Sequence, residues 1–127
     1  MKRTLFLSVL FGMLLVTAHA ENESHQQVDS TLYAYYRWCN NNIRDTAVLS
    51  KADTLFRLSG EKHDIRMQAV ALSVKADHYY FNNALDSLKA WIPRVQDFAR
   101  KHNQLKYYYF TWSRLILYYT KQAQYTL

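Results

Sequence analysis

Trp112–Tyr119 reads WSRLILYY, and Thr120–Leu127, which follows it, reads TKQAQYTL. Within the first stretch, Trp112, Leu115 and Tyr119 are three and four residues apart, a spacing that places their side chains on one face of an α-helix. The second stretch, with a small residue before another tyrosine, predicts a turn and the opening of a further helix. Because the apolar face of the first helix needs a cover, we expect the rest of that further helix beyond the end of this sequence.

The same spacing of apolar residues recurs through the preceding sequence and predicts an all-α fold. Beyond residue 20 there is one glycine and one proline, too few for the turns of a sheet-rich or loop-rich fold. Long helices joined by short polar turns need few such residues, and neighbours joined in this way lie antiparallel. The helices predicted from the spacing cover about 30–40, 46–59, 64–81, 84–101 and 105–120.

Local signals mark the ends of these helices. Asn40-Asn41-Asn42 ends the first helix, because asparagine competes for backbone hydrogen bonds and tolerates left-handed conformations. Asn82-Asn83 is the turn after the third helix, and His102-Asn103 marks the end of the fourth. Asp64 is suited to cap the start of the third helix. Gly60 is predicted to supply the left-handed residue that ends the second helix. Pro93 falls inside the fourth helix, so we expect either a kink or a break with Pro93 in the first turn of a restarted helix.

Three tyrosines indicate that the helices repeat in pairs. Tyr36, Tyr79 and Tyr119 each close an odd-numbered predicted helix, and they are 43 and 40 residues apart. A polar turn containing asparagine or glutamine follows each of them. A period in this range is typical of stacked helical hairpins, in which no single hairpin can bury its own apolar face. We therefore expect each pair of helices to cover the next one along the chain.

The apolar positions resemble those of tetratricopeptide repeats. In that family the first helix of a pair carries a large apolar residue, leucine three residues on and tyrosine four after that. The second helix carries alanine, an aromatic residue four on and a small residue three after that. The residues that fit these two patterns are Trp112, Leu115 and Tyr119, and Ala52, Phe56 and Ser59. Ile116 stands where the family has a small residue, and the spacing exceeds the family's usual period of about 34 residues.

This resemblance implies a tetratricopeptide-like α-solenoid fragment over residues 30–127, with the last repeat incomplete. In such arrays the first helices of the pairs line a concave face that binds a peptide or a partner protein. Residues beside the matched positions would face that groove, and these are Arg37, Ser73, Asp77, Tyr80, Ser113, Thr120 and Lys121. The runs of tyrosine fit two roles, packing between repeats or lining a groove, since tyrosine offers a large contact area at low entropic cost.

The start of the chain has the composition of a secretory signal peptide. Lys2 and Arg3 precede an apolar run over residues 5–16, and Ala-His-Ala at 18–20 precedes a polar stretch. We expect cleavage after residue 20, a flexible polar lead-in over 21–29, and a secreted or periplasmic protein with no membrane insertion in its mature part. An uncleaved anchor is the second alternative, although the run is shorter than the roughly 20 residues that span a bilayer. A buried helix is the third.

Charge and cysteine content exclude several classes of protein. The formal net charge is +6, and loss of Lys2 and Arg3 with the signal peptide would lower it to +4. These charges are scattered, whereas a nucleic-acid-binding protein concentrates basic residues on one surface. Cys39 is the only cysteine, so the chain cannot form an internal disulfide or a zinc site with several cysteines. We interpret Cys39 as a small apolar residue on a helix.

No motif in the sequence predicts catalysis. The chain lacks His-Glu-x-x-His, a glycine-rich phosphate loop and Gly-x-Ser-x-Gly. His63 and His78 lie at opposite ends of one predicted helix and cannot share a metal ion. We therefore expect a protein that is not an enzyme and uses neither a cofactor nor a metal.

Two functions follow from these observations. The first is a non-catalytic exported interaction or scaffold module that binds a peptide or a partner protein. The second is the periplasmic sensor region of a two-component histidine kinase or a transcriptional regulator, with further repeats or a signalling domain beyond Leu127. A third interpretation is a small exported bundle, complete as it stands, without exposed apolar surface. In a packed repeat, Trp112 should lie between the fourth and fifth helices, where Trp112→Ala would cost roughly 3–5 kcal/mol.

Overall fold

The computed structural model describes residues 27–126, and the described residues form five α-helices and no strand. The predicted signal peptide, its cleavage site and most of the predicted lead-in lie outside the described residues. The helices are α2 (Ser30–Asn41), α3 (Ala47–Glu61), α4 (Ile65–Phe81), α5 (Leu85–Lys101) and α6 (Leu105–Thr126). The all-α prediction is confirmed.

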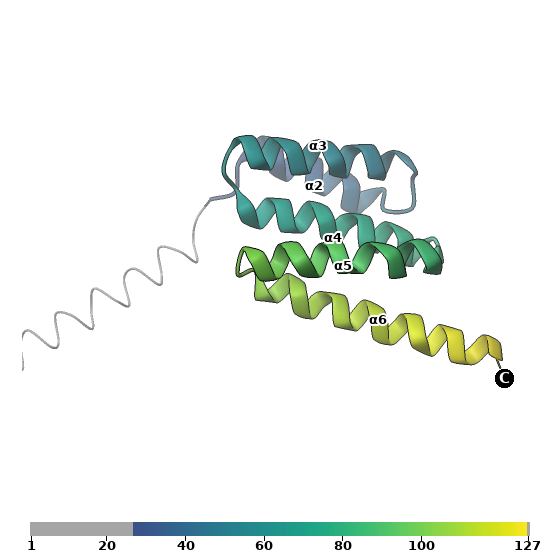
Figure 1. The fold of residues 1–127 in the computed structure, drawn as a ribbon. Helices are drawn as coiled ribbons and strands as arrows, with labels where there is room; N and C mark the ends of the chain where they lie inside the picture. Colours follow the sequence, from purple (N-terminus) through teal and green to yellow (C-terminus); the bar gives the residue numbers. More distant parts are fainter. Residues whose placement is uncertain (1–26, 127) are drawn as a thin grey trace, which may run out of the picture.

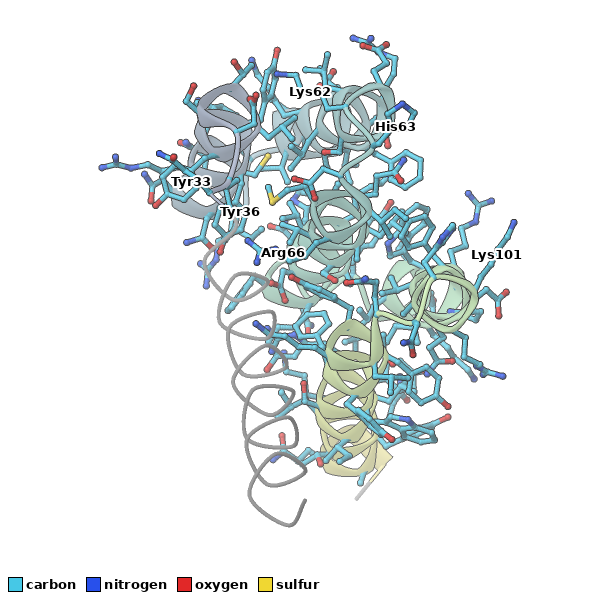
Figure 2. All side chains as sticks on the ribbon, turned by 90° about the vertical axis from the view of Figure 1, so that its left-hand side faces the viewer. Tyr33, Tyr36, Lys62, His63, Arg66 and Lys101 are labelled. Atoms are coloured by element: carbon cyan, nitrogen blue, oxygen red, sulfur yellow. The ribbon has the colours of Figure 1, made fainter. Side chains whose placement is uncertain are left out.

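The helices form antiparallel hairpins stacked along one direction (Figure 1). Helix α4 is central, because it packs against each of the other four. Figure 2 views the helices end-on, with α2, α4 and α6 in one layer and α3 and α5 in the other. The two helices of the second layer meet through Phe56 and Phe98, whose ring centroids are 5.6 Å apart. The layer of α2, α4 and α6 contains the first helix of each pair.

Three connections between helices share one geometry. His63, Asn83 and Asn103 each have a φ of 55°. In each case the N–H of the following residue donates to the carbonyl oxygen five residues earlier, at 2.7–2.8 Å. This left-handed ending satisfies carbonyl groups that the helix leaves unpaired. The prediction for Gly60 is wrong, because α3 continues through it and the left-handed residue is His63, directly before the cap of α4.

Two local predictions about helix boundaries can be compared with the structure. Asp64 caps α4, since its carboxylate accepts a hydrogen bond from the backbone N–H of Met67 at 3.0 Å. Pro93 lies inside one unbroken helix, so the predicted alternative of a break and restart is wrong. Packing accounts for the continuity, because Ile92 and Val95 on either side of the exposed Pro93 are buried in the core.

The core consists of three clusters between the two layers. The buried residues of the first two clusters come from α2, α3 and α4, and they are Leu32, Leu55, Met67 and Ala71, and Cys39, Val48, Ala52 and Val74. The third cluster joins α4, α5 and α6 through Ala76, Leu88, Ile92 and Tyr118. Cys39 is fully buried, and burial raises the pKa of its thiol.

The last helix differs most from the prediction. Helix α6 runs unbroken to Thr126, so the turn and new helix predicted after residue 120 are wrong. The segment from 120 to 126 contains neither glycine nor asparagine, and its lysine, glutamines and alanine favour helix. Trp112 is 49% exposed rather than packed between helices, and Tyr118 is 5% exposed against 58% for Tyr119. The buried face of α6 is therefore rotated relative to the predicted stripe.

Candidate functional site: a groove across α2, α4 and α6

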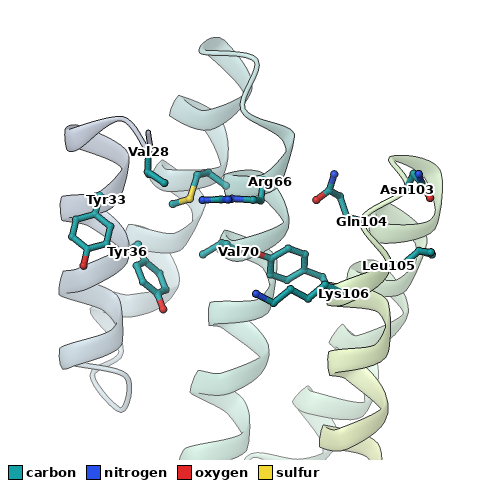
Figure 3. A pocket seen from close by; sticks show the side chains of 11 residues that line it. Val28, Tyr33, Tyr36, Arg66, Val70, Asn103, Gln104, Leu105 and Lys106 are labelled. Carbon is teal, nitrogen blue, oxygen red and sulfur yellow. The ribbon is translucent and has the colours of Figure 1, made fainter. Parts of the chain in front are cut away.

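A groove lies between α2 and α6 and crosses the face of α4 (Figure 3). It consists of two adjoining pockets of about 510 and 210 Å³, which share Tyr36, Val70, Lys106 and Tyr107. The other residues lining the larger pocket are Val28, Tyr33, Arg66, Met67, Asn103, Gln104 and Leu105. The other residues lining the smaller pocket are Asn40, Ser73, Val74, Asp77 and Phe110.

The stacking of the helices creates this groove. Helices α2 and α6 each pack against α4 rather than against each other, so one side of α4 forms the floor between them. The floor residues Arg66, Val70, Ser73 and Asp77 recur at three- and four-residue spacing, which keeps them on one face of α4. Both walls are therefore positioned by contacts with a single helix.

Tyrosine side chains form much of the walls. Tyr33 and Tyr36 come from α2, with ring centroids 6.2 Å apart, and Tyr107 comes from α6. Burial raises the pKa of Tyr107; the charge of Arg66 lowers it in part, and Tyr36 raises it further. Tyr36, Arg66 and Tyr107 all line the larger pocket. The Tyr107 hydroxyl stays protonated at neutral pH and can donate a hydrogen bond to a ligand.

The charges in the groove do not cancel. Arg66 and Lys106 are exposed, and neither forms an ion pair with any residue that the structure describes. Lys106 extends from α6 toward α4 (Figure 3), with its Nζ 5.8 Å from the ring centroid of Tyr107. Among the described lining residues, Asp77 is the only acidic one, and it pairs with Arg114. The groove is left with two positive charges that lack a counter-ion among the described residues.

The Asp77–Arg114 pair joins the floor of the groove to α6. Arg114 Nη2 and Nε lie 2.6 and 2.8 Å from Asp77 Oδ1. Burial raises the pKa of Asp77, and the charge and hydrogen bond of Arg114 oppose that effect. The guanidinium also lies over the rings of Tyr80 and Phe110, 4.8 and 5.0 Å from their centroids. Arg114 is thus engaged within the fold rather than available to a ligand.

The structure places the seven predicted groove residues in different environments. Ser73 and Asp77 line the smaller pocket, where the Ser73 hydroxyl donates to the carbonyl of Ala69 at 2.9 Å. Tyr80 lies beside the groove and packs against Arg114 and Lys121, whose Nζ is 4.4 Å from the Tyr80 ring centroid. The remaining three are exposed and lie outside the lining of both pockets: Arg37, Ser113 and Thr120.

The sequence contained a signal for the residues that this prediction missed. Arg66 and Lys106 each lie three positions after a left-handed turn residue, His63 and Asn103 respectively. The two cations are therefore 40 residues apart, and the same spacing separates Met67 from Tyr107, which also line the groove. Repeats aligned on their turns would have placed both cations on the same face of successive first helices.

Other classes of site find no support among the described residues. Over residues 27–126, no group of three or more histidine, cysteine, aspartate or glutamate side chains is arranged to hold a metal ion. None of the helices described here is both long and apolar enough to cross a membrane. No protein-family model matches the chain, and comparison with curated proteins and with solved structures finds no significant relative.

Proposed function

We propose that this protein is an exported, non-catalytic interaction module of the tetratricopeptide type, which binds an extended acidic segment of a partner protein in the groove. Three features support the repeat architecture: antiparallel hairpins, turns of equal geometry at equal spacing, and first helices that share one layer. The basic start, apolar run and Ala-His-Ala of residues 1–20 support export.

The charge of the groove is the observation that carries the proposal. Arg66 on the floor and Lys106 on the wall have no protein counter-ion among the described residues, whereas Asp77 is neutralised by Arg114. A carboxylate can accept two parallel hydrogen bonds from a guanidinium and a further one from an ammonium group. Such an anion would satisfy both cations at once.

The tyrosines support an extended polypeptide as the ligand. Tyr33, Tyr36 and Tyr107 line the groove on both sides of α4, so apolar side chains of a bound segment can pack on their rings while their hydroxyls bond its backbone. The larger pocket, about 510 Å³ and open to solvent, is in the size range of protein ligand sites. A segment in which acidic and apolar residues alternate combines both requirements.

A binding measurement with a defined probe tests the proposal. The probe is a short fluorescein-labelled peptide in which glutamate alternates with leucine, and its control replaces each glutamate with glutamine. We expect anisotropy titrations at low salt to show binding of the acidic peptide, and Arg66→Ala or Lys106→Ala to weaken it at least about 10-fold. Higher salt should weaken it as well, because exposed charges are screened.

Lys101→Ala is the matched control, since Lys101 lies at the end of α5, on the opposite side of the molecule from Tyr36 and Arg66 (Figure 2). This variant should bind the acidic peptide as the wild type does. Equal affinity for the glutamine peptide, or an equal loss in Lys101→Ala, would show that the groove does not recognise carboxylates.

A further inference from the structure

Helix α6 carries a row of uncovered apolar side chains along the side that faces away from the core. We call this row the α6 stripe, and its members are Leu105, Tyr109, Trp112, Ile116 and Tyr119. Each of these side chains is between 49% and 64% exposed. Thr111 and Tyr118, on the other side of the helix, are buried. An exposed row of this kind marks an interaction surface more often than a free surface.

The spacing of the α6 stripe is that of a helix-pairing seam. Its members are separated by four, three, four and three positions, the pattern of the two apolar positions in a heptad. The neighbouring positions on either side are occupied by Tyr108, Ser113, Leu115 and Thr120, and by Lys106 at one end. Since only the last of these is charged, a second helix could lie along the seam without facing a row of like charges.

The corresponding face of α4 shows what this surface is built to receive. The turn residues His63 and Asn103 set an offset of 40 residues between α4 and α6. With that offset, Trp112 and Ile116 correspond to Leu72 and Ala76 on α4. Helix α5 covers both of these: the Nε1–H of its Trp91 donates to the Leu72 carbonyl at 2.9 Å, and its Leu88 and Ile92 pack with Ala76. None of the described helices covers the equivalent face of α6.

We propose that α6 of a second copy of this chain covers the stripe, with the two α6 helices antiparallel about a twofold axis. The stripe is complementary to itself in this orientation. With the axis beside position 114, Trp112 faces Ile116 of the second copy, and Tyr109 faces Tyr119 of the second copy. These layers pair an aromatic ring with a ring or an aliphatic side chain, and the same contacts occur twice, as an isologous interface requires.

The outward face of α2 is a poorer partner for the α6 stripe in a head-to-tail arrangement. The exposed positions of α2 at the same kind of spacing are Ser30, Ala34, Arg37 and Asn41. Ala34 is the one apolar member of this row, so the row offers the α6 stripe no large apolar side chain. When α6 pairs with α6 of a second copy, each helix contributes a row of large apolar side chains to the contact.

The size of the stripe sets the expected affinity. An aromatic side chain can bury about 150–250 Å², so five half-exposed side chains contribute roughly 500 Å² per copy. The resulting total of roughly 1,000 Å² lies at the lower limit for specific protein–protein interfaces. We therefore expect a dimer with a dissociation constant in the micromolar range.

Sedimentation of the purified full chain tests the oligomeric state. Between about 1 and 100 μM, the wild type should pass from monomer to dimer. Ile116→Lys and, independently, Tyr109→Lys should weaken dimerisation at least about 30-fold, because each buries a charge without a partner. Ile65→Lys replaces an exposed isoleucine outside the stripe and should dimerise as the wild type does. Circular dichroism confirms that each variant keeps its helices.

A cysteine placed beside the proposed axis tests the orientation of the two helices. Ser113→Cys should form a disulfide between two copies under mild oxidation with copper phenanthroline, and adding Ile116→Lys should abolish it. Ser50→Cys, exposed on α3, is the control and should form far less, while native Cys39 is buried. A monomeric wild type, a dimer that persists in both lysine variants, or equal cross-linking of the two cysteine variants would overturn the proposal.

Discussion

The first and the last of the described helices, α2 and α6, differ in their outward faces. Helix α2 buries Leu32 and Cys39 completely, and its one large apolar side chain that is half exposed, Tyr33, lines the groove. Helix α6 buries Thr111 and Tyr118 and leaves five large apolar side chains exposed along its stripe. A helix inside a stack needs two apolar faces, one for each neighbour, whereas a helix at a finished end needs one. By this criterion, among the described helices, α2 has the outward face of a closed end and α6 has that of an open end.

The largest expected difference between the two ends is the cost of removing an apolar side chain. Leu55→Ala, which truncates a fully buried residue against α2, should lower the free energy of unfolding by about 2–5 kcal/mol. Trp112→Ala on α6 should cost less than about 1 kcal/mol, because half of its surface is already in water. Urea denaturation in the Ile116→Lys background removes the contribution of dimerisation. A Trp112→Ala cost as large as that of Leu55→Ala would show that the open end is closed within the monomer.

The next prediction concerns the ion pair between Arg114 and Asp77, which joins α6 to α4. Arg114→Ala should lower the free energy of unfolding by about 1–3 kcal/mol, because it leaves a half-buried Asp77 carboxylate without its partner. Burial already raises the pKa of Asp77, and loss of Arg114 should raise it further. Since the folded-state pKa then exceeds the unfolded one, protonation favours the folded state, and the deficit should shrink as the pH falls through that pKa.

Two measurements check this interpretation. Unfolding of Arg114→Ala and the wild type is compared from neutral to acidic pH, and Asp77→Asn is added to the variant as a control. The double variant should recover part of the stability at neutral pH and lose the pH dependence. A deficit that is the same at every pH would assign the cost to lost contacts with Tyr80 and Phe110 instead.

The smallest expected effect compares the turns near the two ends. His63 and Asn103 both adopt a φ of 55°, a conformation that costs most side chains about 1–2 kcal/mol and that asparagine tolerates better. His63→Gly should therefore raise the free energy of unfolding by about 0.5–1 kcal/mol, after allowance for the entropy of glycine in the unfolded chain. Asn103→Gly should change it little. A loss of stability in His63→Gly would mean that the imidazole makes contacts that outweigh the backbone cost.

The boundaries of the helices could be predicted because the relevant signals are local. Asp64 binds the backbone of the residues that follow it, and Asn83 and Asn103 favour the left-handed conformation by themselves. The prediction that Gly60 ends α3 was wrong, because glycine permits a left-handed conformation without requiring one. The apolar residues on either side of Pro93 outweighed its tendency to break the helix, and that balance depends on packing against other helices.

The groove could be predicted only in part. Ser73 and Asp77 were expected to face it from their place beside the matched stripe, and they line the smaller pocket. Arg66 and Lys106 were not expected to face it, because the predicted groove residues were taken only from positions beside the matched stripe. For the runs of tyrosine, which include Tyr107, packing and groove lining were both left open. Each residue advances a helix by about 100°, so positions one residue before and one residue after a stripe lie on opposite sides of it.

The amino-acid sequence by itself determined that the described chain is helical and where most of the helices begin and end, because capping, turn conformation and apolar spacing act within a few residues of one another. Only the tertiary structure decided that Tyr118 rather than Tyr119 is buried, that Arg66 and Lys106 line one groove, and that the α6 stripe faces solvent. Adjacent tyrosines are chemically alike. The choice between them depends on contacts with helices far away in the sequence, and these contacts form only when the hairpins stack.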